Sequence, residues 1–417
     1  MATAKSVWEP GRQVKVAAQA DVVVAGGGIA GVSAALAAAR SGAKVILLEK
    51  QCALGGLATL GLIIIYLPLC DGYGRKLIGG IGEELLLKSV RAGQLKRPEG
   101  KENPRASIPK CWQREASPEE RAKKRYQVAY DAAPMMLALE QLLLREGIDI
   151  WYDSHLCGCG IENGLLRHVF VENKSGRLAI SAKAYVDCTG DADLCFLAGE
   201  DTFSSDQNRR SGWYFGADLS RCEINLHPNT DPLKGPCPEG SRFYSGDDGR
   251  DVSQYIIDMH KFILDKSREY NRRTGAQEIP FLIPMMPLFR MTRRLSSVRD
   301  IAPSHIGLWM DDAVGMTGDW RKPALGYCVT LSSLYGRKTG NLLAAGRCMG
   351  AKDDAWDVLR VIPPCAVTGE AAGTAAAMLA QNRASTIQEL SAPYLADILR
   401  ERGVIINKEL LEPMQQL

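Results

Sequence analysis

Three glycines and one acid near the start of the chain could hold the phosphates and a ribose of a dinucleotide. Gly26, Gly28 and Gly31 follow an apolar run in a G-x-G-x-x-G pattern. The first glycine permits a tight turn, the second lets the backbone approach a pyrophosphate, and the third lets a helix pack closely. Glu49 can accept hydrogen bonds from ribose hydroxyls, which favours FAD or NAD over NADP.

The elements that must position these residues form a strand–helix–strand unit. The segment 21–25 is apolar after Asp21, as expected of a parallel strand that is buried on both faces. We predict a helix over 29–40 and a second strand over 44–48. The helix offers unpaired N–H groups and the positive end of its dipole to the phosphates. We therefore expect its first residues, Ile29 and Ala30, and the neighbour of the acid, Lys50, to line the same site.

Two later segments have the composition of ligand-binding loops. Gly55-Gly56-Leu57-Ala58-Thr59 comes soon after the acid, and its glycines permit close backbone approach to an extended ligand. A predicted strand ends in Thr189-Gly190 and is followed by Asp191. The carboxyl ends of parallel strands are where such folds bind ligands. We place Leu156 at the same site.

The α/β pattern returns near the C-terminus. A strand over 342–345 leads into Gly346-Arg347-Cys348, and Arg360 precedes Pro363 and Pro364. We predict a helix over 368–381, with its N-terminus around 366–369 and with Gly369 permitting close packing against another element.

Together these segments resemble the FAD-dependent oxidoreductases that have a glutathione-reductase-like flavin domain. The resemblance rests on GG-x-A-T at 55–59, TGD at 189–191, AGR-C at 345–348, R-V-x-P-x-C at 360–365 and G-x-AAG at 369–373. It implies noncovalent FAD in an extended form. It also implies that the isoalloxazine ring lies between residues 55–59, residues 346–348 and the C-terminal helix, whose positive end would stabilise reduced flavin.

The chain also departs from the relatives of glutathione reductase. Arg347 follows Gly346 where those relatives often have an aspartate that binds the ribitol chain. No C-x4-C or C-x2-C pair follows Gly56, and no second G-x-G-x-x-G unit is present. These differences argue against a disulfide reductase and against a built-in NAD(P)H domain.

The predicted fold class is α/β: a Rossmann-like FAD-binding domain with an inserted α+β substrate domain. We expect an N-terminal arm over 1–20 and a discontinuous FAD-binding domain over 21–65, 126–200 and 336–385. Inserted substrate or cap regions would cover 66–125 and 201–335. A C-terminal helical extension would cover 386–417.

Four side chains are candidates for catalysis. Arg290 and Arg293 could anchor a carboxylate substrate; the alternative is structural ion pairs with Asp300, Asp311 or Asp312. His227 and His305 lie in the predicted insert and could act as acid or base groups.

The composition of the chain limits the classes of partner that we expect it to bind. The chain has 417 residues, a net charge of +3 and 46% hydrophobic residues, which is ordinary for a globular enzyme and too weakly basic to indicate nucleic acid. Apolar runs near the N-terminus are too short to insert into a membrane. The twelve cysteines are scattered, so we expect a cytoplasmic location and no metal site. A small-molecule substrate is expected. A homo-oligomer or an electron-transfer partner protein remains open.

We therefore predict an FAD-dependent oxidoreductase that transfers hydride between flavin N5 and a small organic substrate, with the arginines favouring an anionic one. Two alternatives remain open. One is a non-redox flavoprotein or NAD-using enzyme of the thiazole-synthase type. The other is a flavin electron-transfer subunit of a larger complex, which the lack of iron–sulfur cysteine runs weakens.

Overall fold

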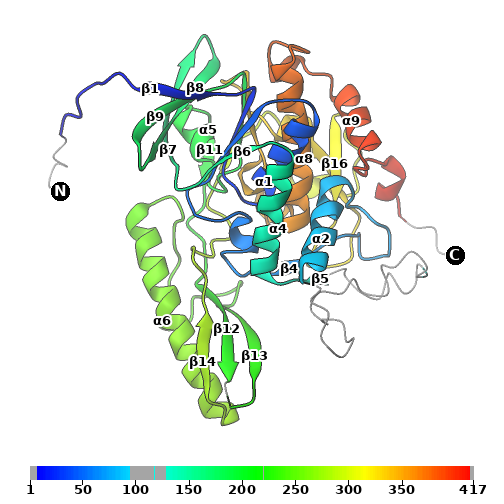
Figure 1. Cartoon of the computed structure of the whole chain (residues 1–417). Coiled ribbons are helices and arrows are strands. Elements are labelled where there is room, and N and C mark those ends of the chain that lie inside the picture. The colour runs from blue at the N-terminus through cyan, green and yellow to red at the C-terminus, as the bar shows by residue number, and fades with distance from the viewer. Residues whose placement is uncertain (1–6, 94–116, 118–127, 219, 414–417) are drawn as a thin grey trace.

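The structure is a computed structural model that describes residues 7–93, 117, 128–218 and 220–413. Most of the second half of the predicted segment 66–125 therefore lies outside the described residues. The chain folds into a large layered body, from which a narrower unit of one long helix and three strands projects (Figure 1). We call this projecting unit the wing.

A five-stranded parallel sheet forms the centre of the body. Val22–Ala25 lies in its middle, and every residue of this strand and of its neighbours on both sides is buried. Such strands need apolar side chains on both faces, which explains the continuous apolar runs. In spatial order the strands are β18 (Leu342–Ala344), β10 (Ala184–Asp187), β2 (Val22–Ala25), β3 (Val45–Leu48) and β6 (Asp149–Trp151).

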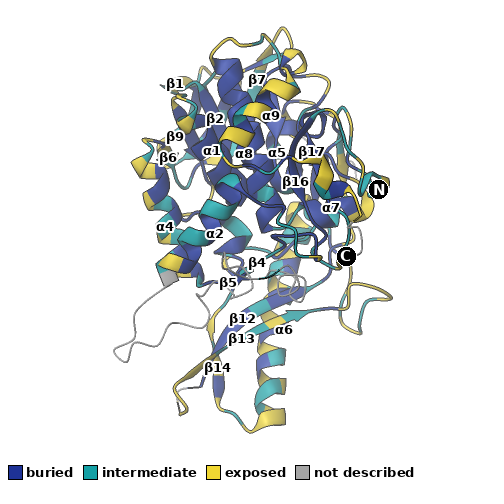
Figure 2. Cartoon of the chain, turned by 90° about the vertical axis from the view of Figure 1, so that its right-hand side faces the viewer, coloured by how far each residue is buried: buried dark blue, intermediate teal, exposed yellow. Residues whose placement is uncertain are grey.

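Two helices cover one face of this sheet. α1 (Ile29–Arg40) and α8 (Ile362–Ala380) pack against each other along their length, and Val22 and Val24 belong to the same apolar core. Both helices consist largely of alanine and glycine. Their small side chains allow the two backbones to approach closely. Both helices are almost entirely buried (Figure 2).

A second sheet covers the opposite face. Val23 and Ala25 of β2 pack there against apolar residues of β8 and β9. This sheet has the order β1 (Lys15–Gln19), β9 (Gly176–Ser181), β8 (Leu165–Asn173) and β7 (His155–Glu162). The predicted N-terminal arm thus contributes a strand, which pairs with β9 in parallel.

The residues from 176 to 187 form two strands rather than one continuous strand. The chain leaves β9 at Ser181 and enters β10 at Ala184, so the two halves belong to different sheets. The hydroxyl of Tyr185 accepts a hydrogen bond from the N–H of Ala182 at 2.7 Å and stabilises the bend between them.

The wing comes from the middle of the chain. Its antiparallel sheet has the order β13 (Glu223–Thr230), β12 (Ser211–Asp218) and β14 (Glu278–Leu282), and α6 (Gly249–Thr274) packs on it. Asp248 caps α6 by accepting a hydrogen bond from the N–H of Asp251, and Gly275 ends it in a left-handed conformation.

The rest of the predicted insert does not join the wing. β16 (Ala313–Thr317) and β17 (Tyr327–Thr330) pair with each other, and β16 packs against α8 and α9 (Ala392–Glu401) of the body. The expected segment 201–335 is therefore divided between two parts of the molecule. The remaining helices and strands are β4 (Ile65–Tyr66), α2 (Gly80–Gly93), β5 (Val128–Ala129), α4 (Ala132–Arg145), α5 (Asp193–Leu197), β11 (Thr202–Ser204), β15 (Arg293–Leu295) and α7 (Asp353–Leu359).

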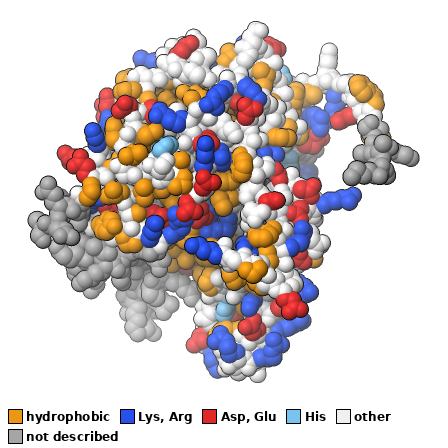
Figure 3. Space-filling view, turned by 180° about the vertical axis from the view of Figure 1, so that it is seen from behind, with side chains coloured by type: hydrophobic (Ala, Val, Ile, Leu, Met, Phe, Trp, Pro, Cys, Tyr) orange, Lys and Arg blue, Asp and Glu red, His pale blue; other side chains and the backbone are white. Residues whose placement is uncertain are grey.

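The charges on the back of the molecule are mixed. Acidic, basic and hydrophobic side chains alternate over this face, with no large area of a single sign (Figure 3). None of the helices in the described ranges is long and apolar enough to cross a bilayer.

The packing of α1 on α8 gives the first prediction. A Cβ at Gly373 would overlap the carbonyl group of Ala34. We expect Gly373→Ala to lower stability by about 1–3 kcal/mol, because the backbones must separate. Thermal unfolding measures the loss. Gly249→Ala is the matched control, because a Cβ there meets no atom within 4 Å. An equal effect of the two substitutions would contradict the close helix contact.

A buried carboxyl group joins α8 to the start of α2. Glu370 is 1% exposed, and its Oε2 accepts a hydrogen bond from the N–H of Ile81 at 2.8 Å. Burial raises the pKa of Glu370 to about 7, because the single backbone N–H offsets only part of the lost hydration. A carboxyl group whose pKa is raised by folding binds its proton more tightly in the folded state. Its contribution to stability therefore falls as the pH rises through 7.

This raised pKa predicts a pH-dependent difference between the wild type and Glu370→Gln. The variant stays neutral and can still accept from Ile81. Relative to the wild type, its free energy of unfolding should rise by about 2–3 kcal/mol as the pH is raised from about 5 to about 8. Denaturant unfolding at several pH values measures this gain. A difference that does not change with pH would show that Glu370 does not titrate in this range.

Candidate functional site

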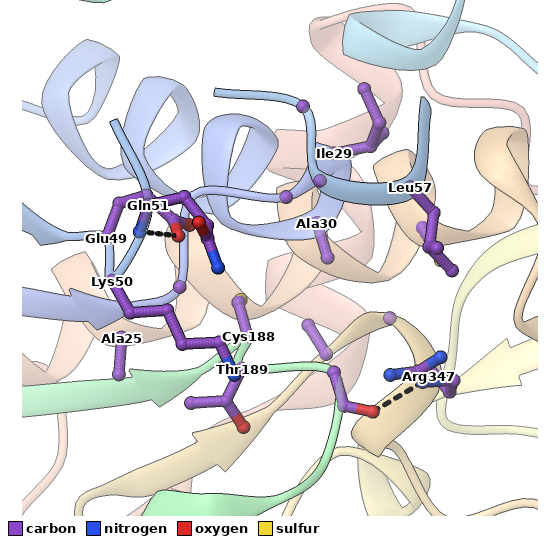
Figure 4. Close-up of a pocket in the computed structure, with 18 of the residues that line it drawn as sticks. Ala25, Ile29, Ala30, Glu49, Lys50, Gln51, Leu57, Cys188, Thr189 and Arg347 are labelled. Atoms are coloured by element: carbon purple, nitrogen blue, oxygen red, sulfur yellow. Dashed lines mark hydrogen bonds between the residues drawn. The ribbon is translucent and has the colours of Figure 1, made fainter. Parts of the chain in front are cut away.

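A deep pocket among the described residues lies at the carboxyl ends of β2, β3 and β10. We call it the main pocket. It contains about 1340 Å³ of space free of protein atoms, counting its open mouth. Glu49, Lys50 and Gln51 lie on one side of it and Arg347 on another, with Ile29, Ala30 and Leu57 nearby (Figure 4). Carboxyl ends of parallel strands are the usual ligand side of such sheets.

The three glycines of the first loop are required for different reasons. A Cβ at Gly26 would overlap the carbonyl of Cys188, and one at Gly31 would overlap the carbonyl of Gly26. A Cβ at Gly28 would meet no protein atom within 4 Å, although Gly28 lines the main pocket. The space next to Gly28 is thus a cradle that a side chain would fill. It fits a group that must touch the backbone, such as a pyrophosphate.

The N-terminus of α1 faces the same cradle. Gly28 is the N-cap residue, it provides no side-chain cap, and the first turn contains no acid. Ile29 and Ala30 line the pocket. Their N–H groups and the helix dipole therefore provide an anion-binding end.

The carboxylate of Glu49 is held in place by backbone groups. One oxygen accepts from the N–H of Gly27 at 2.6 Å and the other from the N–H of Gln51 at 2.7 Å. Glu49 is 7% exposed and lines the main pocket. Each oxygen keeps acceptor capacity, so the group can still bind ribose hydroxyls.

Arg347 connects three segments at the other side of the pocket. Its guanidinium donates to the carbonyl of Gly190, to the carbonyl of Phe289 and, at 2.8 Å, to Asp191. It thereby joins the loop after β10 to the segment that enters from the wing. The side chain is only 11% exposed, so Arg347 brings a fixed positive charge to the pocket wall.

Two further arginines line the pocket and share one carboxylate. Arg290 donates to Asp357 at 3.2 Å, and Arg360 donates to the same oxygen at 2.5 Å. Burial and the neighbouring charge of Arg290 lower the pKa of Arg360 to about 10. Although burial alone would raise it, Arg360 and Arg290 hold the pKa of Asp357 below its usual value. Arg290, Arg360 and Asp357 together therefore carry a net positive charge at neutral pH.

The C-terminal helix begins earlier than predicted. α8 starts at Ile362 rather than near 366–369, with Val361 as N-cap and both prolines in the first turn. Proline suits this turn because its fixed φ is helical and its missing N–H would have no partner there. Ile362 and Cys365 line the main pocket. The positive end of the helix therefore lies beside Arg360.

Four predicted cofactor residues support the pocket from outside its lining. Gly31 and Gly369 permit close packing around α1, and Asp191 pairs with Arg347. Thr59 donates to the carbonyl of Leu54 at 2.5 Å and stabilises the second glycine loop. The remaining predicted positions line the pocket, namely Gly26, Gly28, Ile29, Ala30, Glu49, Lys50, Gly55, Gly56, Leu57, Ala58, Leu156, Thr189, Gly190, Gly346, Arg347 and Arg360.

Of the four candidate catalytic side chains, Arg290 alone lines the main pocket. Arg293 forms an ion pair with Asp193 at 2.6 Å. His227 lies in the wing, 2.6 Å from Glu278 and stacked on Tyr214. These contacts give Arg293 and His227 structural partners, and neither residue lines the main pocket.

His305 belongs to a different pocket on the surface of the body. Its Nδ1 accepts a hydrogen bond from the N–H of Ala302 at 3.2 Å. We call this site the second pocket. It is lined by Phe203, Arg294, Ser296, Ser297, Val298, Arg299, Asp300, Ala302, His305, Arg337, Lys352, Asp353 and Trp356.

Cys348 is a structural thiol. It is completely buried, and its sulfur accepts hydrogen bonds from the N–H groups of Gly190 at 3.1 Å and Ala192 at 3.3 Å. Burial raises the pKa of Cys348 well above its usual value, so the thiol stays protonated.

Several lining residues were not predicted from the sequence. Cys365 and Cys188 stand inside or beside quoted motifs, so their neighbours could have indicated them. Ser154, His155 and Met286 carry no recognisable spacing signal, and the fold brings them to the pocket from distant segments. Asp193 also lines the pocket, and burial together with Asp191 raises its pKa to about 6.

Comparison with solved structures finds distant likenesses. The chain is 16% identical to a geranylgeranyl bacteriochlorophyll reductase-like protein from Thermoplasma acidophilum, with 93% of this chain and 84% of the other covered and a TM-score of 0.44. It is 16% identical to CabE, an aromatic hydroxylase from angucycline biosynthesis, over 94% and 70% of the two chains with a TM-score of 0.45. A 3-ketosteroid dehydrogenase from Rhodococcus jostii RHA1 matches at 13% identity over 87% and 98% of the two chains, with a TM-score of 0.38.

Comparison of sequences is more decisive. No curated protein sequence matches the chain. The family model described as FAD dependent oxidoreductase matches residues 21–218 and 301–400, which is more than half of the chain. These ranges contain the glycine loop, Glu49, the loop after β10 and the start of α8. The cofactor is thus FAD rather than NAD, and the chain belongs to the family of FAD-dependent oxidoreductases.

Proposed function

We propose that this enzyme transfers hydride between the flavin of FAD and a small anionic organic substrate that binds at Arg290. The observation that carries the proposal is the pair Arg290 and Arg360, which lines the main pocket and shares the single carboxylate of Asp357. Two cations with one counter-charge favour an additional anion beside them.

The arrangement of the pocket residues fits FAD in one orientation along the pocket. Glu49 would bind the adenosine ribose, and Gly28 with the N-terminus of α1 would hold the pyrophosphate. Arg347, Leu57 and the start of α8 would then surround the flavin. When bound, FAD supplies the two-electron chemistry at its ring. The protein side chains and backbone groups only orient the bound FAD and stabilise the charge on it.

The two arginines differ in exposure. The Arg360 side chain is 11% exposed and bonds to Asp357 through two nitrogens, whereas the Arg290 side chain is 25% exposed and bonds through one. Arg290 therefore keeps more free donors. It is the better group to contact substrate, while Arg360 stabilises negative charge near the start of α8.

The placement of FAD predicts the effect of Glu49→Gln. An amide has one acceptor oxygen and no charge, so it cannot accept from Gly27 and Gln51 and also bind a ribose as strongly. We expect the dissociation constant for FAD to rise about tenfold or more. Flavin fluorescence titration of the apoprotein measures it. Glu162→Gln, at an exposed position of β7, is the control. Unchanged FAD affinity would remove Glu49 from the site.

The proposed reaction is tested by anaerobic reduction and reoxidation of the flavin. Matched pairs of a carboxylic acid and its neutral amide are mixed with the FAD-loaded enzyme, and separately with the photoreduced enzyme. Flavin absorbance then reports electron transfer in either direction. We expect the acid to react faster than its amide. A flavin that no small molecule oxidises or reduces would contradict the proposal and favour a non-redox or electron-transfer role.

The role of Arg290 gives a further prediction. Arg290→Ala should lower kcat/KM for the anionic substrate about 30-fold, or about 2 kcal/mol, because a charge-assisted hydrogen bond is lost. FAD content should not change. Arg268→Ala, at an exposed position of α6, is the control. An equal loss with the neutral amide would show that Arg290 acts on the fold and not on the substrate charge.

A further inference from the structure

The second pocket is separate from the site proposed for FAD and substrate. Its lining shares no residue with the main pocket. It lies where β15 and the loop after it face the start of α7, and it contains about 1330 Å³ of space free of protein atoms, counting the part open to solvent. Trp356 lines the second pocket, and its Nε1 donates to the carbonyl of Arg347, a residue of the main pocket, at 2.9 Å.

The lining of the second pocket is positively charged. Arg294, Arg299, Arg337 and Lys352 contribute four cations, whereas Asp300 and Asp353 are its carboxylates. In the part of the chain that the structure describes, the Lys352 ammonium has no hydrogen-bond or ion-pair partner. Arg337 donates to the carbonyls of Ser297 at 2.7 Å and Val298 at 2.6 Å, so its charge is held by neutral groups. Arg299 forms an ion pair with Asp312 at 2.9 Å. Arg337 and Lys352 are therefore the cations of this pocket that have no carboxylate partner among the described residues, and they suit a phosphate dianion.

Arg294 is the buried element of this pocket. Its side chain is 7% exposed, and one terminal nitrogen donates to Asp300 at 2.9 Å and to the carbonyl of Leu295 at 3.0 Å. Its Nε is buried and has no hydrogen-bond partner among the described residues. A buried donor without a partner costs about 1–3 kcal/mol. An anion in the pocket would provide that partner.

Aromatic rings form part of the same wall. The guanidinium of Arg294 lies 5.0 Å from the ring centre of Phe203 and 5.5 Å from that of Trp356. Phe203 is 50% exposed and Trp356 is buried, so one ring is available for stacking while the other supports it. His305 adds a ring whose Nε2 carries the proton in the neutral form, since Nδ1 accepts from Ala302.

We propose that the second pocket binds a nucleoside phosphate, with the phosphate among Arg294, Arg337 and Lys352 and the base on Phe203. Cations in this number suit a phosphate dianion better than a single carboxylate. An exposed ring next to them suits a planar base. The proposal does not depend on the identity of the substrate at Arg290.

Binding of ADP to the FAD-loaded enzyme tests the proposal. ADP is a fragment of FAD, so the experiment uses fully flavinated protein and confirms by absorbance that no flavin is released. Equilibrium dialysis compares ADP, adenosine and inorganic phosphate. We expect one ADP per chain, with weaker binding of phosphate and of adenosine. Absence of ADP binding, or ADP binding only with loss of FAD, would overturn the proposal.

Two surface variants locate the ADP. Lys352→Ala should weaken ADP binding about fivefold to tenfold and inorganic phosphate by a similar factor. Phe203→Ala should weaken ADP about fivefold and leave phosphate unchanged. Lys408→Ala, an exposed lysine of the C-terminal segment, is the control. Unchanged ADP affinity in both test variants would place the nucleotide elsewhere, and equal affinity of ADP and phosphate would remove the base from Phe203.

Discussion

The site depends on the close crossing of α1 and α8. Cβ atoms at Gly369 and Gly373 would overlap the backbone of Ala30 and Ala34, so the two helices touch through backbone atoms. Gly346 joins the same contact, because its N–H donates to Thr368 at 2.9 Å and a Cβ there would press on Ala30. The first loop, the loop after β18 and the start of α8 thus meet at one point. Without this contact the two ends of the main pocket would have no fixed separation.

A second interaction fixes the segment that leads from the wing to the main pocket. Asn208 is 2% exposed, and its side-chain oxygen accepts from the N–H groups of Arg290 and Met291, both at 3.0 Å. Its amide nitrogen donates to the carbonyl of Met291 at 2.6 Å. One buried amide therefore fixes the backbone on which Arg290 stands. A charged side chain can bind a substrate selectively only when its backbone is held in this way.

The sequence indicated the parts of the site that are encoded locally. Strand β2, helix α1 and Glu49 follow from apolar runs, glycine spacing and one acid, and all lie where a nucleotide unit requires. Other features depend on partners far away in the chain. The pairing of Arg290 with Asp357 and the stacking of His227 on Tyr214 cannot be seen in local spacing. The break between β9 and β10 also has no local signal, because the bend at residues 182–183 contains neither glycine nor proline.

The three glycines of the first loop show how far one motif can be interpreted. Gly26 and Gly31 have steric reasons within the protein, because Cys188 and the carbonyl of Gly26 leave no space for a side chain. Such positions would be glycine in any protein with this turn. Gly28 faces open space, so only an external group explains it. Within this motif, Gly28 therefore indicates a bound ligand, whereas Gly26 and Gly31 indicate only the turn. The charged residues around the ligand decide what chemistry it performs.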